Sequence, residues 1–456
     1  MAKQKTQYVC QSCGAAQPRW LGRCPSCGAW NTLAEEKVVA AASSGAKGRG
    51  GRGGEKAEPT ILADIAPDRS PRLPSGIAEL DRVLGGGFVT GSTVLIGGDP
   101  GVGKSTLMLQ AASEMAAQGV GVLYISAEEA PGQIRLRSDR LDLPSRNMQV
   151  LGDGDADAAL AWADKLKPGL IVVDSIQTCR REEFDSAPGT VTQVREVASL
   201  WSDYAHRTGS TVALVGHVTK EGAVAGPRVV EHLVDAVLMF EGDNLGSVRL
   251  LRTLKNRHGA TGELGVFEMT GGGLAGISDP SRRFVAVREN PVSGVAVAAV
   301  VRGSRPMLIE IEALVTASLY ASPQRNGTGV DPRRMAMWIA VLEKRVGLGL
   351  AGRDVFLNAT GGVRLEDSGA DLAACAAIFS SLRDRPLAAN TVLIGEVGLT
   401  GELRSVQAMD RRLSEAAHLS LKTAVIPSGW KGDVPKGLKV IPAKTLEEAL
   451  DLAALN

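Results

Sequence analysis

The sequence predicts an α/β protein with a parallel sheet that helices cover on both faces. Apolar segments such as STVLIGG, VGVLYIS, LIVVDSI and STVALVGHV alternate with segments of helical periodicity such as KSTLMLQAASEMAAQG, DADAALAWADKLK and VTQVREVASLWSDYAHRTG. Strands with apolar side chains at consecutive positions are buried on both faces, which is typical of parallel sheets. After residue 233 the segments VDAVLMFEG, SVRLLRTLK and ELGVFEMT predict an antiparallel extension.

The composition changes along the chain in a way that predicts several domains. Its 456 residues are more than one hydrophobic core usually serves. We predict a cysteine-containing element at residues 1–34, the central α/β domain at 60–278 and a second α/β domain at 284–456. Residues 35–59 are mainly Gly, Ala, Ser and charged residues, which cannot form a core, so we expect a flexible linker there.

The charge balance excludes a protein that attracts nucleic acid over its whole surface. The 51 basic and 50 acidic residues give a net charge of +1, so any nucleic-acid contact must be local. The N-terminus lacks an apolar segment of signal-peptide length, and no run of about 18 apolar residues predicts a membrane helix. We therefore expect a cytoplasmic protein without a membrane partner, in which clustered cysteines bind metal rather than form disulfides.

Two CxxCG segments, CQSCG and CPSCG, lie close together near the N-terminus. Two thiolates on each tight turn can reach one tetrahedral Zn²⁺, and Gly14 and Gly28 allow the turn geometry. A site closed by four thiolates has no open coordination position, so the zinc is expected to be structural. Trp20 and Trp30 are expected to form a small core beside it rather than a base-stacking platform. The predicted zinc ligands are Cys10, Cys13, Cys24 and Cys27.

The segment GDPGVGKS matches the phosphate-binding pattern G-x-x-x-x-G-K-[ST] and lies between a predicted strand and a predicted helix, as that pattern requires. Backbone N–H groups at the start of the helix can surround phosphate oxygens. Lys104 is expected to reach the β- and γ-phosphates of ATP, and Ser105 to hold Mg²⁺. The predicted nucleotide-binding residues are Gly98, Asp99, Pro100, Gly101, Val102, Gly103, Lys104, Ser105 and Thr106.

Three polar residues at strand ends complete the predicted catalytic site. Asp174 ends LIVVD and is expected to accept from the water shell of Mg²⁺. Glu128 follows VGVLYIS and is expected to orient the attacking water; the alternative is that Glu128 and Glu129 are exposed carboxylates at a helix start. His217 lies near the end of STVALVGHV and is expected to sense the γ-phosphate, the alternative being a hydrogen-bonded core histidine.

The segments PSGIAELDRVLGGGFVTGS, YISAEEA, GHVTKEG and KNRHG, together with the four-cysteine element, resemble the bacterial RadA/Sms family of DNA repair and recombination proteins over essentially the whole chain. The resemblance implies a RecA-like P-loop ATPase core and a homohexamer with ATP at the joint between protomers. It also implies that Lys255 and Arg257 of KNRHG neutralise charge on the neighbour's phosphoryl group, a solvated strand end being the alternative. The family has phenylalanine where this chain has His258, which puts the role of that aromatic in doubt.

Residues from 284 onward resemble the proteolytic domain of Lon in the order of their strands and helices. A Lon protease needs a serine nucleophile and a lysine that takes its proton. The matching positions are Gly369 and Asp410, neither of which can perform its step, and the adjacent Ser368 would point elsewhere. We therefore expect a Lon-protease-like domain that lacks the catalytic dyad and serves assembly or DNA binding.

Two predicted loops, residues 175–190 and 218–232, leave strand ends where RecA-like proteins bind single-stranded DNA. Their cations predict salt-dependent, sequence-independent phosphate contacts, although ordinary charged loops have the same composition. The resemblance implies a DNA-dependent ATPase that acts as a helicase-like motor in branch migration of recombination intermediates, with single-stranded DNA, branched DNA and the RecA recombinase as partners. A non-translocating nucleotide switch is the alternative, and Gly369 and Asp410 disfavour an ATP-dependent protease. The predicted DNA contacts are Arg180, Arg181, Lys220 and Arg228.

Overall fold

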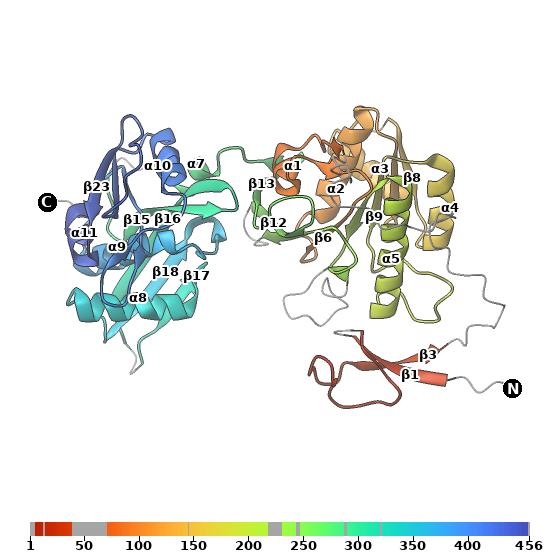
Figure 1. The fold of residues 1–456 in the computed structure, drawn as a ribbon, viewed down its shortest axis with the longest axis horizontal. Helices are drawn as coiled ribbons and strands as arrows, with labels where there is room; N and C mark the ends of the chain where they lie inside the picture. The colour runs from red at the N-terminus through yellow and green to blue at the C-terminus, as the bar shows by residue number, and fades with distance from the viewer. Residues whose placement is uncertain are drawn as a thin grey trace, which may run out of the picture. The chain divides into compact units, whose positions relative to one another are not determined.

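A computed structural model describes residues 5–11, 14–38, 71–144, 146–217, 230–242, 247–286, 290–319 and 322–454 of the chain (Figure 1). The chain divides into two compact units. The first holds Met1–Asn244, Arg249–Thr261 and Phe267–Gly276, and the second holds Leu245–Val248, Gly262–Val266 and Ile277–Asn456. No helix in the described part of the chain is both long and apolar enough to cross a bilayer.

The first unit is built on a nine-stranded sheet in the order β14-β13-β12-β11-β6-β10-β9-β7-β8. The strands from β11 to β8 in this order are parallel to their neighbours, and β12 is antiparallel to β11. The expected antiparallel extension therefore begins one strand later than predicted, because the long connection over 216–235 allows β11 to cross over and join the parallel part. The strands are β6 (Thr93–Gly98), β7 (Val122–Ser126), β8 (Met148–Leu151), β9 (Leu170–Asp174), β10 (Thr211–Val215), β11 (Ala236–Gly242), β12 (Val248–Asn256), β13 (Leu264–Thr270) and β14 (Gly273–Gly276).

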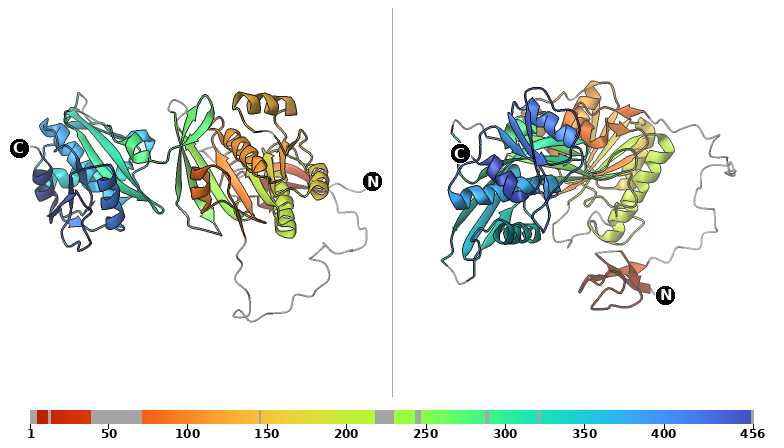
Figure 2. Two further views of the ribbon diagram at one scale, coloured as in Figure 1. Left: turned by 90° about the horizontal axis from the view of Figure 1, so that it is seen from above. Right: turned by 60° about the vertical axis from the view of Figure 1, so that its left-hand side comes forward.

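Helices cover both faces of this sheet, as Figures 1 and 2 show. Val94 and Val172 belong to a core cluster that includes residues of α1, α2 and α3. Their neighbours along the strands, Leu95 and Ile171, belong to a separate cluster with α4 and α5. Successive strand residues thus enter opposite cores, which confirms the predicted double-faced burial. The helices are α1 (Ala78–Leu84), α2 (Lys104–Ala117), α3 (Pro131–Arg140), α4 (Ala156–Leu166) and α5 (Val191–Thr208).

Local sequence signals set the ends of the two helices on the second face. The Asp155 side chain accepts hydrogen bonds from the first turn of α4, and Thr190 does the same for α5. Gly209 ends α5 with φ 78°, a conformation that favours glycine. The structure also contains helix α3 and strand β8, which the sequence did not predict. Helix α3 buries only Ile134 and Ser138, and a helix that buries so little needs no strong apolar periodicity in its sequence.

The second unit contains a seven-stranded mixed sheet in the order β17-β18-β16-β15-β19-β22-β23. Its central helix α9 is almost wholly buried and contacts β15 and β16. The strands are β15 (Val295–Arg302), β16 (Arg305–Ala317), β17 (Arg325–Thr328), β18 (Arg353–Ala359), β19 (Thr391–Leu393), β22 (Thr423–Pro427) and β23 (Lys439–Ala443), and the helices are α7 (Pro280–Phe284), α8 (Pro332–Arg345), α9 (Asp371–Arg383), α10 (Met409–His418) and α11 (Leu446–Ala453). Short strand pairs are β20 (Glu396–Val397) with β21 (Leu403–Arg404) and, in the first unit, β4 (Arg72–Leu73) with β5 (Phe88–Val89).

The N-terminal element is a three-stranded sheet of β1 (Lys5–Cys10), β2 (Ala16–Gln17) and β3 (Leu33–Val38). Its core consists of Cys10, Cys24 and Leu33, with smaller contributions from neighbouring aliphatic residues and Tyr8. The prediction that Trp20 and Trp30 form this core is wrong, because their exposed fractions are 54 % and 69 %. Thiol and aliphatic groups fill the small interior, which leaves no room for two indole rings.

Candidate nucleotide and metal sites

The phosphate-binding loop connects the end of β6 to the start of α2. A Cβ on Gly98, which has φ 153°, would lie 2.5 Å from the carbonyl oxygen of Phe240. A Cβ on Gly103, which has φ 115°, would lie 2.9 Å from Met269. Only glycine therefore fits both ends of the loop. The start of α2 has no side-chain cap, so its N–H groups are available to an anion.

Lys104 is held inside this loop. The side chain is buried, and its Nζ atom donates to the carbonyl oxygens of Gly98, at 2.8 Å, and Asp99, at 2.9 Å. Burial lowers the pKa of Lys104, while the nearby carboxylates of Asp174, Asp99 and Glu128 act in the opposite direction. A buried ammonium group whose hydrogen-bond partners carry no negative charge gains strongly from contact with phosphate oxygens.

Ser105 and Asp174 meet, although they come from elements 69 residues apart. The Ser105 Oγ atom donates to Asp174 Oδ1 at 3.1 Å, and Tyr124 donates to Asp174 Oδ2 at 2.7 Å. Burial raises the pKa of Asp174, while the hydrogen bonds from Tyr124 and Ser105 act in the opposite direction. A hydroxyl and a buried carboxylate beside a phosphate loop are oxygen donors that suit Mg²⁺.

Glu128 and His217 also meet, and they do so beside Lys104. Glu128 follows β7, and its Oε1 atom accepts from the Ser175 hydroxyl and lies 3.2 Å from His217 Nε2. His217 follows β10, the strand between β6 and β9, and its Nδ1 atom lies 3.2 Å from Lys104 Nζ. Since Lys104 can only donate, Nδ1 must accept, and Nε2 then carries the proton that is donated to Glu128.

The neighbouring Glu129 has a different environment from Glu128. The Arg137 guanidinium forms an ion pair with the Glu129 carboxylate. The backbone N–H and carbonyl oxygen of Glu129 form hydrogen bonds with the Ser126 hydroxyl. Glu129 thus belongs to the β7–α3 connection. Glu128 instead joins the hydrogen-bonded chain from Lys104 through His217.

Lys255 and Arg257 lie at the other end of the sheet from the phosphate loop of their own chain. Asn256, at the end of β12, pairs with Ala236 at the start of β11, which pairs with Val94 near the start of β6. The phosphate loop follows the other end of β6, and the four residue steps from Val94 to Gly98 span about 13 Å along the strand. A cation at this position cannot reach the nucleotide that its own chain binds.

Both cations are positioned by groups of their own chain. Arg257, whose side chain is 51 % exposed, forms an ion pair with the buried Asp235 at 3.2 Å. Asp235 also accepts from the backbone N–H of Thr93 at 2.9 Å. Lys255 Nζ donates to the carbonyl oxygens of Glu231 and Val234, and burial lowers its pKa, with Arg257 as a further cause.

The predicted DNA contacts have different surroundings. The Arg180 side chain is 56 % exposed, and Glu182 lies 3.9 Å away. Arg181 is only 19 % exposed and forms ion pairs with Asp157 and Glu183. Arg181 therefore already has two carboxylate partners. Lys220 and Arg228 lie outside the described residues.

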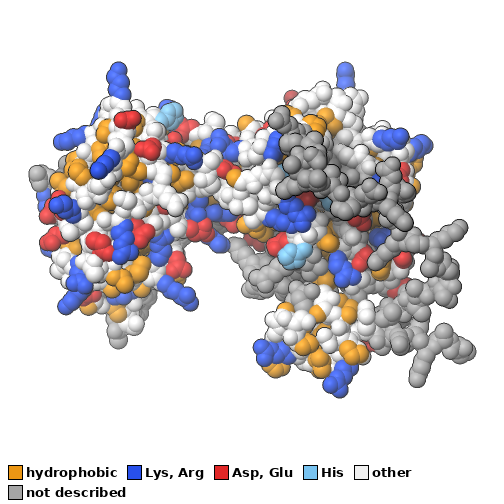
Figure 3. Space-filling view, viewed as in Figure 1, with side chains coloured by type: hydrophobic (Ala, Val, Ile, Leu, Met, Phe, Trp, Pro, Cys, Tyr) orange, Lys and Arg blue, Asp and Glu red, His pale blue; other side chains and the backbone are white. Residues whose placement is uncertain are grey.

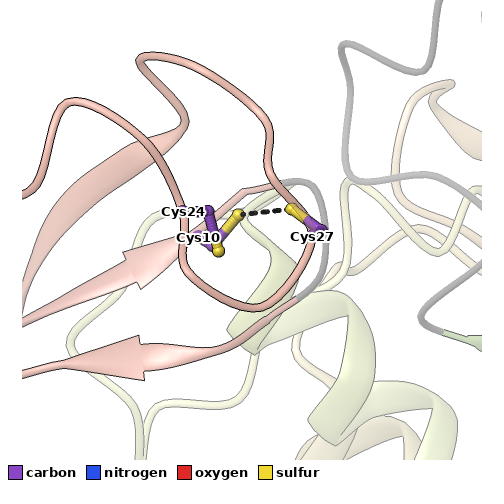
Figure 4. A group of neighbouring side chains, drawn as sticks. All are labelled: Cys10, Cys24 and Cys27. Atoms are coloured by element: carbon purple, nitrogen blue, oxygen red, sulfur yellow. Dashed lines mark hydrogen bonds between the residues drawn. The ribbon is translucent and has the colours of Figure 1, made fainter.

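The N-terminal element brings three of the four predicted zinc ligands together (Figure 4). The sulfur atoms of Cys10, Cys24 and Cys27 lie within 4.8 Å of one another, and Cys13 lies outside the described residues. The two turns share one geometry: the N–H of Gly14 donates to Cys10 O at 2.8 Å, and Gly28 repeats this with Cys24 O at 2.9 Å. Three converging thiols on paired turns fit a tetrahedral Zn²⁺.

In the second unit, a buried ion pair lies beside Gly369, the position that the sequence matched to the serine of a Lon protease. Arg412, which is 3 % exposed, lies 2.7 Å from Asp367, which also accepts from the backbone N–H of Gly369 and Val301. A Cβ on Gly369 would lie 2.5 Å from Arg412 Nη1. A side chain at position 369 would thus meet a buried guanidinium group. The loss of a Lon-type dyad in this domain stays a prediction.

Replacing Gly369 by Ser should lower the stability of the second unit by about 1–3 kcal/mol and create no peptidase activity, because the new side chain overpacks a guanidinium group that cannot leave its carboxylate. Thermal unfolding measures the first effect and cleavage of an unstructured protein substrate the second. Ser368→Ala, one residue away, is the matched control and should change the Tm less. Peptidase activity in the wild type that Ser368→Ala abolishes would contradict this interpretation.

Three residues that position the site were missed by sequence reasoning. Tyr124 holds Asp174, Ser175 holds Glu128, and Asp235 holds Arg257. Tyr124 looks like an ordinary aromatic residue of a buried strand. Ser175 directly follows Asp174, and this adjacency is the one signal that could have indicated it.

Comparisons with protein families agree with a nucleotide site in the first unit and a metal site in the N-terminal element. An AAA domain matches residues 64–223, and a rubredoxin metal binding domain matches residues 8–35. Fold and site therefore define a P-loop ATPase that carries a zinc ribbon.

Known relatives extend over the whole chain. DNA repair protein RadA of Pseudomonas aeruginosa is 49 % identical over 452 residues, which cover 99 % of both chains. The RadA proteins of Bacillus subtilis and Brucella abortus are 43 % and 46 % identical, over 99 % and 94 % of both chains. The chain belongs to the RadA family of DNA repair proteins. Among solved structures, a KaiC-like protein of Pyrococcus horikoshii OT3 has a TM-score of 0.39 at 21 % identity and covers 46 % of this chain and 99 % of its own.

Proposed function

We propose that this RadA-family ATPase works as a ring-shaped homohexamer that moves along single-stranded DNA and hydrolyses ATP at the seams between protomers. Its task would be the helicase-like branch migration of recombination intermediates during DNA repair, together with the RecA recombinase. The observation that carries the proposal is the place of Lys255 and Arg257. They lie toward the end of the sheet that is away from their own phosphate loop, which supports a role at a second protomer's nucleotide.

Each protomer would supply most of one nucleotide site. The N–H groups of the loop and Lys104 bind the phosphates, and Ser105 and Asp174 hold Mg²⁺, which neutralises phosphate charge when bound. Glu128 orients the attacking water. His217 links Glu128 to Lys104, so the movement of Lys104 from carbonyl oxygens to phosphate oxygens changes the hydrogen bonding of Glu128.

The neighbouring protomer would complete the site. Arg257 and Lys255 approach the γ-phosphate across the seam and stabilise the charge that develops in the transition state. Asp235 acts as the positioning residue, because it holds the Arg257 guanidinium from the protein side and leaves the rest of the group exposed.

Contact with DNA would come from the loops at 175–190 and 218–232. Arg180 is the described cation with the most accessible side chain among those predicted, and Arg181, Lys220 and Arg228 remain part of the proposal. The names of the relatives, DNA repair proteins, support DNA as the ligand. Phosphate contacts of this kind make binding independent of sequence and strongly dependent on salt.

The test measures ATP turnover by the full-length protein with and without single-stranded DNA. The mass of the protein in solution and its displacement of a strand from a branched duplex are measured under the same conditions. A motor should hydrolyse ATP faster with DNA and displace the strand, and Lys104→Ala should abolish displacement. DNA binding and nucleotide exchange without displacement would instead favour a non-translocating switch, and would contradict the proposal.

A further inference from the structure

The zinc ribbon presents two indole rings to solvent. Trp20 and Trp30 are 54 % and 69 % exposed, which is unusual for the largest apolar side chain. A Cβ built on Gly22 would lie 3.7 Å from Trp20 Cη2 and 4.0 Å from Trp30 Cζ3. The six-membered rings of both indoles therefore converge on Gly22, each within van der Waals distance of its Cβ position.

Two arginines lie close to these rings along the chain, and one of them contacts Trp30. Arg23 pairs with Trp30 across a short antiparallel bridge, and its guanidinium carbon lies 5.7 Å from the centroid of the Trp30 ring. Arg23 Nε donates to Gly28 O at 3.0 Å, which fixes the group beside the second zinc turn. Arg19 is also exposed, and residues 14–34 contain no acidic side chain. Figure 3 shows basic and apolar side chains side by side on this element.

We propose that Trp20 and Trp30 form a stacking platform for unpaired bases of single-stranded DNA, with Arg19 and Arg23 contacting the adjoining phosphates. Flat rings stack on every base, and guanidinium groups beside them bind the backbone, which is how proteins hold single strands without reading sequence. The predicted DNA loops have almost no aromatic residues, so this platform supplies the base contacts that they lack. The charge favours a polyanion over an apolar protein surface. The inference rests on the proposed function, because it takes the same single strand as ligand.

The experiment compares two oligonucleotides of equal length, one with bases and one abasic, at fixed salt and with a nonhydrolysable ATP analogue bound. Their affinities are measured for the full-length, zinc-loaded wild type and for the double variant Trp20→Ala/Trp30→Ala. The wild type should bind the abasic strand about 10-fold more weakly than the normal strand. The double variant should lose the same factor on the normal strand and nothing further on the abasic strand.

Two control variants separate stacking from damage to the fold. Trp162→Ala removes another exposed tryptophan, 45 % exposed on α4, and should bind both strands like the wild type. Trp20→Phe/Trp30→Phe keeps aromatic rings and should recover most of the base-dependent affinity. Zinc content, measured for every variant, should equal that of the wild type, because both indoles lie outside the core of the ribbon.

The outcomes distinguish the platform from the motor. If the wild type binds both strands equally well, or the double variant binds like the wild type, the platform is wrong while the proposed function stands. If the wild type binds neither strand, both fail. A double variant with normal DNA binding but lost repair activity in cells would overturn the platform in favour of a protein partner.

Discussion

Replacing Glu128 by Gln lowers the rate of ATP hydrolysis by about 100-fold or more and leaves ATP binding nearly unchanged. Glutamine keeps the shape of the side chain and can still accept a hydrogen bond from Ser175, but it has one acceptor oxygen fewer and no charge with which to orient the attacking water. It also removes the negative charge that faces His217 Nε2 at 3.2 Å. Single-turnover hydrolysis, measured beside the dissociation constant of a fluorescent ATP analogue, separates the chemical step from binding.

Glu129→Gln is the matched control for this prediction. The two residues are adjacent and the chemical change is the same, but Glu129 is bound to Arg137 in the β7–α3 connection. Glu129→Gln should therefore keep hydrolysis within a few-fold of the wild type. Equal losses in the two variants would mean that Glu128 acts only through the local fold, and a larger loss in Glu129→Gln would reverse the assignment.

Arg257→Ala is expected to reduce DNA-stimulated ATP turnover by about 1,000-fold, the effect of removing a cation that stabilises the phosphoryl group in the transition state. The oligomer should still form. The decisive measurement mixes this variant with Lys104→Ala. Each variant alone is inactive, but in mixed oligomers about a quarter of the seams join an intact phosphate loop to an intact Arg257, so activity should reappear.

Recovery on mixing can arise only if the two residues act in one site from different chains. Arg135→Ala, which removes an exposed guanidinium ion-paired with Asp139 on α3, should keep full turnover and shows that loss of an arginine is not enough. A mixture that stays inactive although mass measurements show mixed oligomers would place Arg257 outside the neighbour's site. Full ATP turnover by the Arg257→Ala variant alone would also place Arg257 outside the neighbour's site.

Much of the first unit could be predicted because its signals are local. Strands buried on both faces are visible as runs such as LIVVD, and the phosphate loop is a contiguous motif between a strand and a helix. The direction of β11 was not predicted correctly. Its apolar pattern fits a parallel or an antiparallel strand, and the direction depends on the long connection before it. Helix α3 was missed because it buries little.

Contacts between residues far apart in sequence explain the rest. Tyr124 and Asp174 are 50 residues apart, and no local pattern shows that their strands are neighbours in the sheet. For the tryptophans of the zinc ribbon, the sequence predicted burial that the structure does not show. A large apolar side chain beside cysteines suggests a core, and only the folded element shows that thiols and aliphatic groups already fill it.

If Arg257 serves a neighbour's nucleotide, as proposed, strand β6 joins two places that serve different nucleotides. Its last residue opens the phosphate loop, and the N–H of its first residue, Thr93, binds the carboxylate of Asp235 that also holds Arg257. Closely packed on both faces, such a strand shifts as one rigid body. In a closed ring, a small displacement caused by ATP at one seam would therefore reach the Arg257 guanidinium that enters the next seam. ATP would then be hydrolysed in neighbouring subunits one after another instead of at random.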